Sequence, residues 1–312
     1  MRRFLVAGES IIDVVNDGGG ARELPGGSPA NVAVGLGRLG NDVALWTHLG
    51  DDPAGDLLSD HLTSSGVELP APRSGTTSRA IAEIRPDGSA RYTFAVEWPG
   101  GPAPAGDALH LHTGSIAALL EPGAADVERL LRDRRATTTI SYDPNIRPAL
   151  VGDCGDRVER IVALSDVVKA SDEDLAWLHP GLPPIDAARR WLALGPALVC
   201  VTRGAEGAVA VAAGAAVEVP PVPVEVVDTV GAGDAFMSGL LDALHTRDLL
   251  GAAARTRLSD IGAADLHEVL SHAALVAALT VARAGAAPPT RTELTTLESR
   301  RRAGPAAGEC LP

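Results

Sequence analysis

The sequence is short of positive charge and of aromatic side chains. Its 312 residues include 27 lysines and arginines against 40 aspartates and glutamates, which leaves a net charge of −13. A chain this acidic lacks the basic surface that nucleic-acid binding requires, and anionic lipid would repel it. Aromatic residues make up only 3%, so the core must consist mainly of alanine, valine and leucine. The 46% of hydrophobic residues is ample for such a core.

Cysteines and long apolar runs are also scarce. Cys154, Cys200 and Cys310 are odd in number and far apart, so we predict neither a disulfide framework nor a cysteine zinc site. The first apolar run, Phe4–Gly8, ends at Glu9 and is too short for an export signal. No run approaches the ~18 apolar residues of a membrane helix. These features predict a soluble, cytoplasmic protein with no membrane partner.

Lysine occurs once, at Lys169, and no glycine run precedes it. This excludes a P-loop and a protein-kinase phosphate site, because both need glycines and a lysine in a fixed arrangement. The segment Gly35–Gly40 matches the dinucleotide pattern G-x-G-x-x-G, but it lies in a helical run that follows Ser28-Pro29 rather than a strand. We therefore expect helix packing by small residues there, and a dinucleotide oxidoreductase is only a rival hypothesis.

Short β-branched runs alternate with longer stretches of helical period that are rich in alanine and leucine. This alternation is typical of a parallel sheet covered by helices, so the expected fold class is α/β. The predicted strands are Phe4–Ala7, Val43–Thr47, Leu109–Thr113, Thr138–Tyr142, Val167–Lys169 and Leu198–Thr202. The predicted helices are Ala30–Leu39, Gly55–Ser64, Asp126–Arg134, Arg157–Leu164, Asp172–Leu178, Asp186–Leu194, Ala235–Leu244 and His267–Arg283.

Two segments, Ile11–Leu24 and Ser78–Val96, break this alternation. The first contains Asn-Asp-Gly-Gly-Gly and the second Pro-Asp-Gly. Both are predicted to be antiparallel hairpins, because these glycines supply the positive φ of tight turns. We expect the hairpins to pair into one small sheet that stands off the main body and closes over a ligand. The residues from Arg300 to Pro312 mix arginine, glycine, proline and alanine, which predicts a flexible tail.

The segment Val226–Phe236, with the sequence VVDTVGAGDAF, carries the clearest chemical signal. Its glycines let backbone N–H groups converge without obstruction by Cβ atoms, just before the predicted helix at Ala235. A helix N-terminus favours phosphate, or negative charge that develops during a reaction. There the carboxylate of Asp234 is placed to take a proton from an attacking hydroxyl. On spacing alone, a helix cap at Asp234 beside an ordinary loop is an equally good interpretation.

This segment closely resembles the C-terminal signature of the ribokinase-like (PfkB) carbohydrate kinases. The upstream block Pro25–Ala33 (PGGSPANVA) resembles the N-terminal signature of the same family. The resemblance implies a ribokinase-like, doubly wound, mainly parallel sheet flanked by helices, with a small β-sheet lid. It divides the chain into a body of residues 1–10, 25–77 and 97–299, a discontinuous lid of residues 11–24 and 78–96, and a tail of residues 300–312.

The resemblance also implies roles for single residues. Asp234 matches the catalytic base of the family, and the anion hole falls on Gly231, Ala232 and Gly233. The sugar is expected between the main sheet and the lid. Its contacts fall on Asp13, Gly26, Gly27 and Asn31. From the residues alone, Asp13 would instead be a solvated charge on a lid strand.

The element Asp143–Arg147 (DPNIR) resembles the Asp-x-Asn-x-Arg element of fructokinases and 2-keto-3-deoxygluconate kinases. It implies that Asn145 and Arg147 contact the substrate. Arg147 also suits a nucleotide phosphate, and a surface arginine is the plain alternative. Lys169–Asp174 (KASDED) aligns with the family's Asn-x-x-Glu element, with Asp174 as a magnesium anchor through water. The same spacing has the form of a helix capping box, and both interpretations can hold together.

The segment Val201–Gly207 (VTRGAEG) looks like the family's strand-end element at the nucleotide phosphates. The predicted nucleotide contacts are Lys169, Ser171, Thr202, Arg203, Gly204 and Gly207, and adenine is expected around His272–Ala278. Asp228 resembles the ligand that relatives use for a monovalent cation, so potassium activation is a hypothesis. His110 and His112 share one face of a strand, but no third metal ligand is evident, and we favour packing or cleft lining.

The sequence therefore predicts an ATP- and Mg²⁺-dependent sugar kinase that phosphorylates a primary hydroxyl, with fructose as the first candidate. A 2-keto-3-deoxygluconate kinase and another sugar or nucleoside kinase of the family are alternatives. The segment Glu97–Gly101 lacks the substrate-contacting arginine that relatives often carry, which weakens any specific sugar. An inactive sugar- or nucleotide-binding protein is the rival from another class, and the intact Gly-Ala-Gly-Asp argues against it. An exposed lid edge makes a homodimer plausible.

Overall fold

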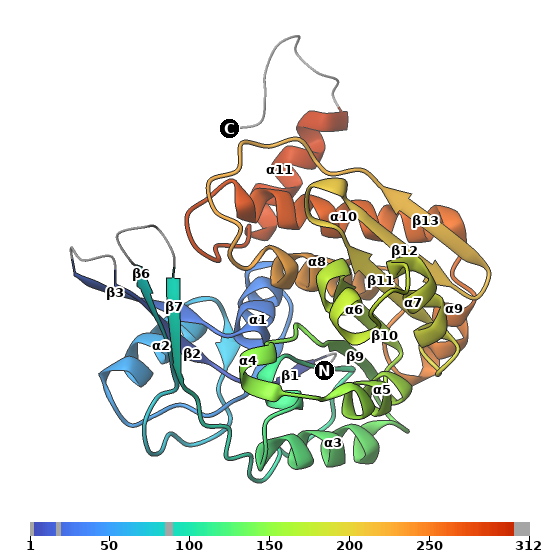
Figure 1. The fold of residues 1–312 in the computed structure, drawn as a ribbon. Coiled ribbons are helices and arrows are strands. Elements are labelled where there is room, and N and C mark those ends of the chain that lie inside the picture. Colours follow the sequence, from blue (N-terminus) through green and yellow to red (C-terminus); the bar gives the residue numbers. More distant parts are fainter. Residues whose placement is uncertain (1–2, 17–19, 85–89, 303–312) are drawn as a thin grey trace.

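A computed structural model of the chain describes residues 3–16, 20–84 and 90–302. Two sheets organise these residues (Figure 1). The large sheet has the strand order β13-β12-β11-β10-β9-β8-β1-β4-β5. Its parallel strands are β1 (Phe4–Ala7), β4 (Val43–Trp46), β5 (Val67–Glu68), β8 (His110–Gly114), β9 (Thr139–Asp143), β10 (Val167–Ser171) and β11 (Leu198–Thr202). The antiparallel strands β12 (Ala208–Ala212) and β13 (Ala215–Val219) extend it at one edge.

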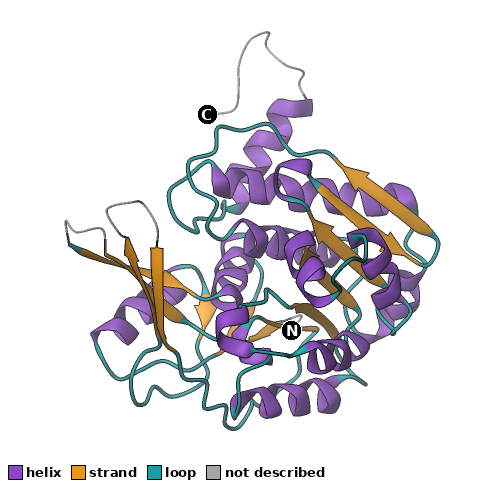
Figure 2. Ribbon diagram, viewed as in Figure 1, coloured by secondary structure: helices purple, strands orange, loops and turns teal. Residues whose placement is uncertain are grey.

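Helices cover both faces of the large sheet (Figure 2). Because neighbouring residues of a strand point to opposite faces, each face has a core of its own. Phe4 and Val6 of β1 pack in the core of α1 (Ser28–Arg38), α8 (Ala232–Thr246) and α10 (Ala263–Val281). Leu5 and Ala7 pack in the core of α3 (Gly123–Arg134), α5 (Gly155–Leu164) and α7 (Pro184–Leu192). The predicted doubly wound α/β fold is confirmed.

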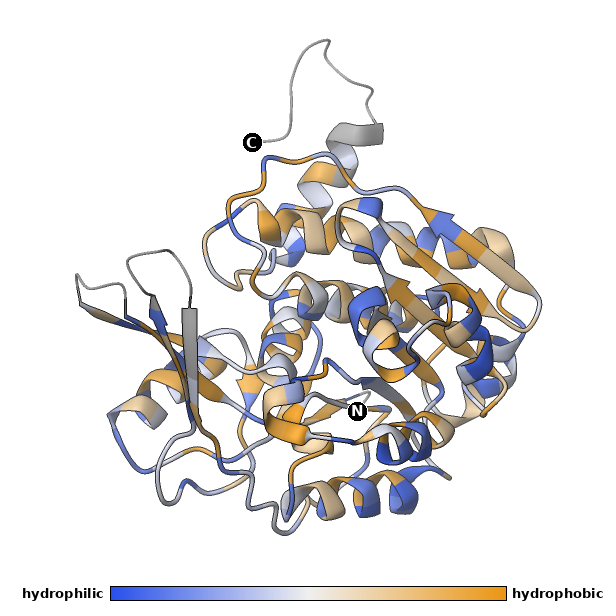
Figure 3. Cartoon of the chain, in the orientation of Figure 1, coloured by the Kyte–Doolittle hydropathy of each residue, from blue (hydrophilic) through white to orange (hydrophobic). Residues whose placement is uncertain are grey.

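Figure 3 shows hydrophobic residues along the strands β11 and β12, whereas α3 carries hydrophilic residues on its outer side. The remaining helices are α2 (Pro53–Ser64), α4 (Pro148–Val151), α6 (Asp172–Leu178), α9 (Arg255–Ser259) and α11 (Arg291–Arg302), with short 3₁₀ turns at η1 (Ile116–Ala118), η2 (Gly204–Glu206) and η3 (Ala252–Ala254).

The predicted strands and helices of the body are all present, with ends that shift by up to a few residues. Prediction missed β12 and β13, whose alanine-rich sequences AVAVA and AAVEV have little intrinsic preference for a strand. It also missed β5, α4, α9 and α11. The predicted tail is wrong for Arg300–Arg302, because these residues continue α11. Residues 303–312 lie outside the described part of the chain.

The two predicted hairpins do form one small sheet, with the order β3-β2-β6-β7. It consists of β2 (Ile11–Asn16), β3 (Ala21–Gly26), β6 (Arg79–Ile84) and β7 (Ala90–Ala95), and its centre is the parallel pair of β2 and β6. The predicted turns at residues 17–19 and 85–89 lie outside the described residues. The sheet stands beside α2 and apart from the large sheet (Figure 1). Ile12 packs with Leu58 of α2, so the alternate residue Asp13 faces the opposite way.

The helix α10 is the one described helix that is long and apolar enough to cross a membrane. Half of it is buried inside the protein. Val269, Leu270 and Ala273 pack in the same core as residues of α8 and of the strands β12 and β13. The apolar composition of α10 is therefore accounted for by its place in the core of the fold.

Candidate functional site

The candidate site is built around the start of α8. Gly231 caps this helix with φ of 74°, in the left-handed region, and a Cβ atom there would lie 2.5 Å from that of Ala286. A glycine is therefore required. The N–H groups of Gly231, Gly233 and Asp234 make no hydrogen bond with any residue that the structure describes, whereas that of Ala232 donates to Thr229 O at 3.3 Å. Of the three residues of the predicted anion hole, the two glycines thus present open donors.

Asp234 lies in the first turn of α8 and is only 8% exposed. Its carboxylate accepts a hydrogen bond from Ser28 Oγ at 2.6 Å and another from Asn31 Nδ2 at 2.8 Å. Both donors belong to α1, so the two sequence signatures meet at this one carboxylate. Asn31 is predicted from the sequence and Ser28 is not, although Ser28 lies one helical turn before Asn31 and so on the same helix face.

Asp13, Gly26 and Gly27 lie together at the foot of the small sheet. A Cβ atom on Gly26 would collide with Asp13 Oδ2, and one on Gly27, whose φ is 103°, would lie 2.6 Å from Glu9 O. Burial raises the pKa of Asp13 to about 6, with Arg147 opposing that shift and Asp234 adding to it. Asp13 is therefore within electrostatic reach of both Arg147 and the predicted base.

Glu9 is a further acidic residue near the site, and it is not among the residues predicted from the sequence. It is 3% exposed, and its Oε2 accepts the N–H of Ala117 at 2.9 Å. Burial raises the pKa of Glu9 to about 7, and the negative charge of Asp234 adds to the shift. Only its place directly after the apolar run of β1 could have indicated a residue at the carboxyl edge of the sheet.

Lys169, predicted to contact the nucleotide, is buried on β10. Its Nζ donates to Asp143 Oδ2 at 2.8 Å, and both side chains are nearly inaccessible, at 5% and 0% exposure. A Cβ atom on Gly233 would lie 2.8 Å from Nζ, so the ammonium lies against the first turn of α8. The structure thus brings Lys169, Gly233 and Asp234 together, and it adds Asp143 to the predicted set.

Ser171 and Asp174 form the predicted capping box at the start of α6. Ser171 Oγ accepts the N–H of Asp174 at 3.0 Å, and Asp174 Oδ2 accepts the N–H of Ser171 at 3.0 Å. The other oxygen of Asp174 accepts the N–H of Ile146 at 2.8 Å, which ties α6 to the Asn145–Arg147 segment. Asn145 has a φ of 38°. Arg147 is exposed, and its guanidinium donates to the carbonyl oxygens of Asn145 and Ile146.

The remaining predicted nucleotide contacts lie in the turn from β11 to β12. Thr202 Oγ1 donates to Ala170 O at 3.4 Å, and Arg203 forms an ion pair with Glu218 of β13. Gly204 and Gly207 have positive φ, and a Cβ atom on Gly207 would collide with Val219 O. The guanidinium of Arg203 is thus already engaged by a carboxylate, and its contact with a phosphate stays a prediction.

Two other predicted positions have well-defined partners. Asp228 accepts the N–H groups of Val230 at 3.0 Å and Gly285 at 2.8 Å, so its carboxylate joins two loops near the start of α8. His272, in the segment expected near adenine, has its Nε2 3.0 Å from Asp242 Oδ2. The described residues contain no group of three histidine, cysteine or acidic side chains that could hold a metal ion.

His110 and His112 are fully buried within the sheet, as the packing interpretation predicted. The two ring nitrogens of His110 lie 2.9 Å from Thr139 Oγ1 and 2.8 Å from Ser141 Oγ, and His112 Nδ1 lies 2.9 Å from Ser141 Oγ. Burial lowers the pKa of both histidines, that of His112 to about 3. Gly35, in the dinucleotide-like segment, packs within α1 against Ser238 of α8, which agrees with helix packing.

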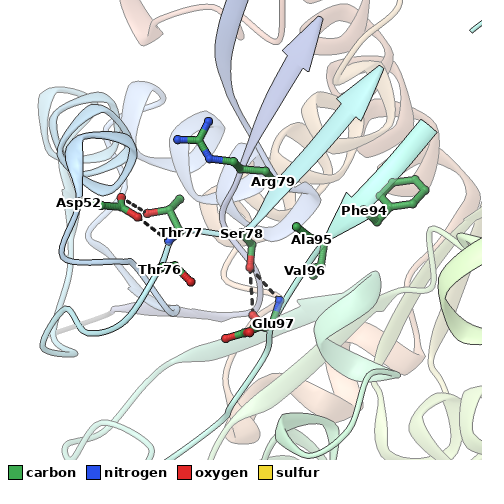
Figure 4. Close-up of a pocket in the computed structure, with 9 residues that line it drawn as sticks. All are labelled: Asp52, Thr76, Thr77, Ser78, Arg79, Phe94, Ala95, Val96 and Glu97. Carbon is green, nitrogen blue, oxygen red and sulfur yellow. Dashed lines mark hydrogen bonds between the residues drawn. The ribbon is translucent and has the colours of Figure 1, made fainter. Parts of the chain in front are cut away.

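A pocket of about 430 Å³ lies where β6 begins and β7 ends (Figure 4). Figure 4 shows Asp52 beside Thr77 on one side of it, with the ring of Phe94 pointing away from them. Asp52 accepts hydrogen bonds from the N–H and Oγ1 of Thr77, which lower the pKa of Asp52 to about 2. None of the predicted site residues lines this pocket. Its lining joins residues of the small sheet to Asp52 of the body.

Known proteins are similar to this chain in both sequence and fold. Residues 3–293 match the family model of the pfkB family carbohydrate kinases. The chain is 36% identical to a fructokinase from Rhizobium leguminosarum bv. trifolii over 264 residues, which cover 79% of this chain and 81% of that protein. The structure of fructokinase with bound ATP from Xylella fastidiosa is similar, with a TM-score of 0.84 and 28% identity over 96% of this chain and 99% of that one. A double-mutant fructokinase from Vibrio cholerae O395, with fructose, ADP and potassium ion bound, gives a TM-score of 0.74 and 26% identity over 95% and 98%.

Proposed function

Since the chain belongs to the pfkB family of carbohydrate kinases, we propose that it is a fructokinase, which transfers the γ-phosphoryl group of ATP to the primary hydroxyl at C6 of fructose. The observation that carries this proposal is the carboxylate of Asp234, held by Ser28 and Asn31 beside the open N–H groups at the start of α8. The fructokinase relatives reported above support fructose as the acceptor.

In the proposed reaction, Asp234 takes the proton of the sugar hydroxyl as its oxygen attacks the γ-phosphorus. The bond from that phosphorus to the bridging oxygen breaks, and ADP leaves. Negative charge that builds on the transferring group is met by the N–H groups of Gly231 and Gly233 and by the positive end of the α8 dipole. Donors fixed in place before the reaction stabilise such charge without reorganisation.

The sugar would lie between the small sheet, acting as the lid, and the start of α8. Asp13 and Asn31 supply polar side chains for sugar hydroxyls, while Gly26 and Gly27 let the backbone approach. Asn145 and Arg147 would complete the site from the β9 side. Burial raises the pKa of Asp13 and the charge of Arg147 opposes this shift, so the two side chains are near enough to contact one small ligand.

ATP would approach from the side of β10 and β11, where Lys169, Ser171, Thr202 and Gly204 lie at or just beyond the strand ends. Mg²⁺ would enter with the nucleotide and neutralise phosphate charge. Both oxygens of Asp174 already accept hydrogen bonds from Ile146 and Ser171, so this carboxylate suits a magnesium contact through water rather than a direct bond. Asp228 would hold a potassium ion beside the anion hole, and equal turnover in sodium and potassium would remove that assignment.

An ADP-release assay against fructose, ribose, 2-keto-3-deoxygluconate, tagatose 6-phosphate and nucleosides tests the substrate. Fructose is expected to give the highest kcat/KM, and preference for a keto-sugar acid or a nucleoside would assign one of the alternative kinases. Release with none of them, together with retained ATP binding, would favour the inactive binding protein. The Asp234→Asn variant is the control for contaminating kinases.

We also propose that two copies pair through the small sheet in the cytoplasm. The edge strand β3 has Ala21, Arg22, Glu23 and Leu24 exposed, and unpaired strand edges favour association. Sedimentation of the wild type and of Leu24→Asp, whose side chain is 46% exposed in the single chain, tests this pairing. A monomeric wild type would contradict it.

A further inference from the structure

Asp143 and Lys169 face each other at the carboxyl edge of the large sheet. The register pairs Val167 with Ser141 and Val168 with Tyr142, so the next pair is Lys169 with Asp143. Both side chains therefore project from the same face of the sheet, toward α8. Their ion pair is almost completely removed from solvent. A buried ion pair brings little net stability, because the loss of hydration offsets most of the attraction.

The ion pair is also incomplete as a structural contact. Asp143 Oδ2 accepts from Lys169 Nζ, whereas Oδ1 is buried without a hydrogen-bond partner among the described residues. A buried oxygen without a partner costs stability, and such atoms call for an explanation in native proteins. The ion pair is not needed to join β9 to β10, because backbone hydrogen bonds between these strands already join them.

Lys169 is directed at the reaction centre. Its Nζ lies where Gly233 has no side chain, next to the open N–H groups of the α8 N-terminus. It carries the only lysine ammonium of the chain. Burial by itself lowers the pKa of Lys169, but Asp143, Asp174 and Asp234 outweigh that effect and raise it, so the ammonium stays charged.

We infer that Asp143 is a positioning residue, which holds the ammonium of Lys169 charged and aimed at the phosphoryl group beside Gly233. This inference rests on the proposed kinase function. Asp143 contributes the contact at 2.8 Å, whereas Asp174 and Asp234 act on Lys169 without a hydrogen bond to it. Asp143 therefore acts through Lys169 rather than on the substrate.

A double-mutant cycle of Asp143→Asn and Lys169→Met tests this coupling. Asp143→Asn is expected to lower kcat/KM for ATP about tenfold or more while KM for fructose stays unchanged. In the Lys169→Met background the same substitution should cost less than about twofold, because the group it positions is gone. Equal losses in both backgrounds, or no loss in the wild type, would overturn the inference.

The matched control is Asp166→Asn. Asp166 is also a buried carboxylate joining β9 to β10, but it lies at the opposite end of the strands, where it accepts the N–H of Ile140 at 2.7 Å. This variant should lower the midpoint of thermal unfolding and leave kcat/KM for ATP unchanged. A drop in kcat/KM comparable to that of Asp143→Asn would show that a general weakening of these strands suffices.

The pH profile gives a second readout, which a purely structural role would not move. Asp143→Asn removes a negative charge that opposes the effect of burial on Lys169, so the pKa of Lys169 should fall. The basic limb of the pH profile of kcat/KM for ATP should then shift to lower pH. The charged and titratable groups that face Lys169 are Asp143, Asp174, Asp234, His112 and Cys200. An unshifted basic limb would contradict the inference.

Binding of a non-hydrolysable MgATP analogue that keeps the γ-phosphoryl group, measured by calorimetry, needs no acceptor sugar. The cycle can therefore be read even if fructose proves not to be the substrate. Non-additive changes in the dissociation constant of this analogue support the inference, and strictly additive ones overturn it. Failure of the wild type to phosphorylate fructose would instead count against the proposed function alone.

Discussion

The two ends of the strands β9 and β10 use buried carboxylates in opposite ways. At the amino end, Asp166 accepts from Arg135 at 2.8 and 2.9 Å, from Arg255 at 2.9 Å and from the N–H of Ile140 at 2.7 Å. At the carboxyl end, Asp143 has one ammonium partner, and its other oxygen has no hydrogen-bond partner in the described part of the chain. The amino end is therefore saturated with donors, and the carboxyl end is not.

This difference separates a structural cluster from a reactive one. Two arginines and a backbone amide donate charge-assisted hydrogen bonds to Asp166, so both of its oxygens have partners. At the carboxyl end, Asp143 and Asp234 are buried beside Lys169, and the N–H groups of Gly231 and Gly233 have no partner among the described residues. Under the proposed function, such an arrangement lowers stability in favour of activity, because the ammonium and the N–H groups would bind phosphate.

The largest expected effect is that of Asp234→Asn at the reactive end. The amide keeps the shape of the carboxylate but cannot accept the hydroxyl proton, so kcat should fall by roughly 10²–10⁴. Sugar binding should persist, because Asp13 and the glycines are untouched. Steady-state kinetics and fructose binding by calorimetry check both points. Near-wild-type turnover would remove Asp234 from the role of base and erase the contrast between the two ends.

Glu9→Gln should stabilise the protein at neutral and alkaline pH. The pKa of Glu9 is raised from 4.5 to about 7 by burial, so the folded state holds its proton more tightly than the unfolded state. The contribution of Glu9 to the free energy of unfolding therefore falls as pH rises from about 4.5 to 7. The variant should gain up to about 3 kcal/mol over the wild type at pH 8, and little at pH 4. Urea unfolding at both pH values measures this, and a pH-independent difference would contradict it.

Asp166→Asn should have the opposite sign. It leaves Arg135 and Arg255 without their shared carboxylate at the amino end, at a cost of about 2–3 kcal/mol in the free energy of unfolding. Chemical denaturation measures the loss. If Asp166→Asn left the free energy of unfolding unchanged, the ion pairs of Asp166 at the amino end would not stabilise the fold.

The smallest expected effect is that of Gly231→Ala. The new side chain must adopt φ near 74° and approach Ala286, which costs about 1–2 kcal/mol of stability. Gly204→Ala is the matched control, since Gly204 also has positive φ, at 51°, but no atom lies within 4 Å of its added Cβ. Thermal unfolding measures the loss of stability in both variants. A larger loss in Gly231→Ala would come from contact with Ala286, whereas equal losses would leave backbone strain as the cause.

Much of the fold was predictable because its signals are local. The apolar runs Phe4–Ala7 and Leu198–Thr202 are strands with the predicted ends. The alanine-rich β12 and β13 carry a weaker signal, because alanine is depleted in strands. They are strands through pairing, β12 with β11 and β13 with β12. The start of α8 was placed three residues late, since the cap at Gly231 depends on packing against Ala286.

The candidate site divides in the same manner. Asp234, Asn31 and Lys169 could be selected from short motifs, each within one segment. Ser28 could not be assigned to Asp234, because 206 residues separate them and their contact depends on how α1 packs against α8. The ion pair of Asp143 with Lys169 likewise requires the register of β9 and β10.

By itself, the sequence determined the alternation of strands and helices, the glycines at the start of α8 and the identity of the carboxylate in its first turn. These depend on backbone preferences and on spacing within a few residues. The tertiary structure alone decided which carboxylates are buried, which have partners, and that the ammonium of Lys169 lies against Gly233. Burial and pairing are properties of atoms brought together from distant parts of the chain, and no local pattern encodes them.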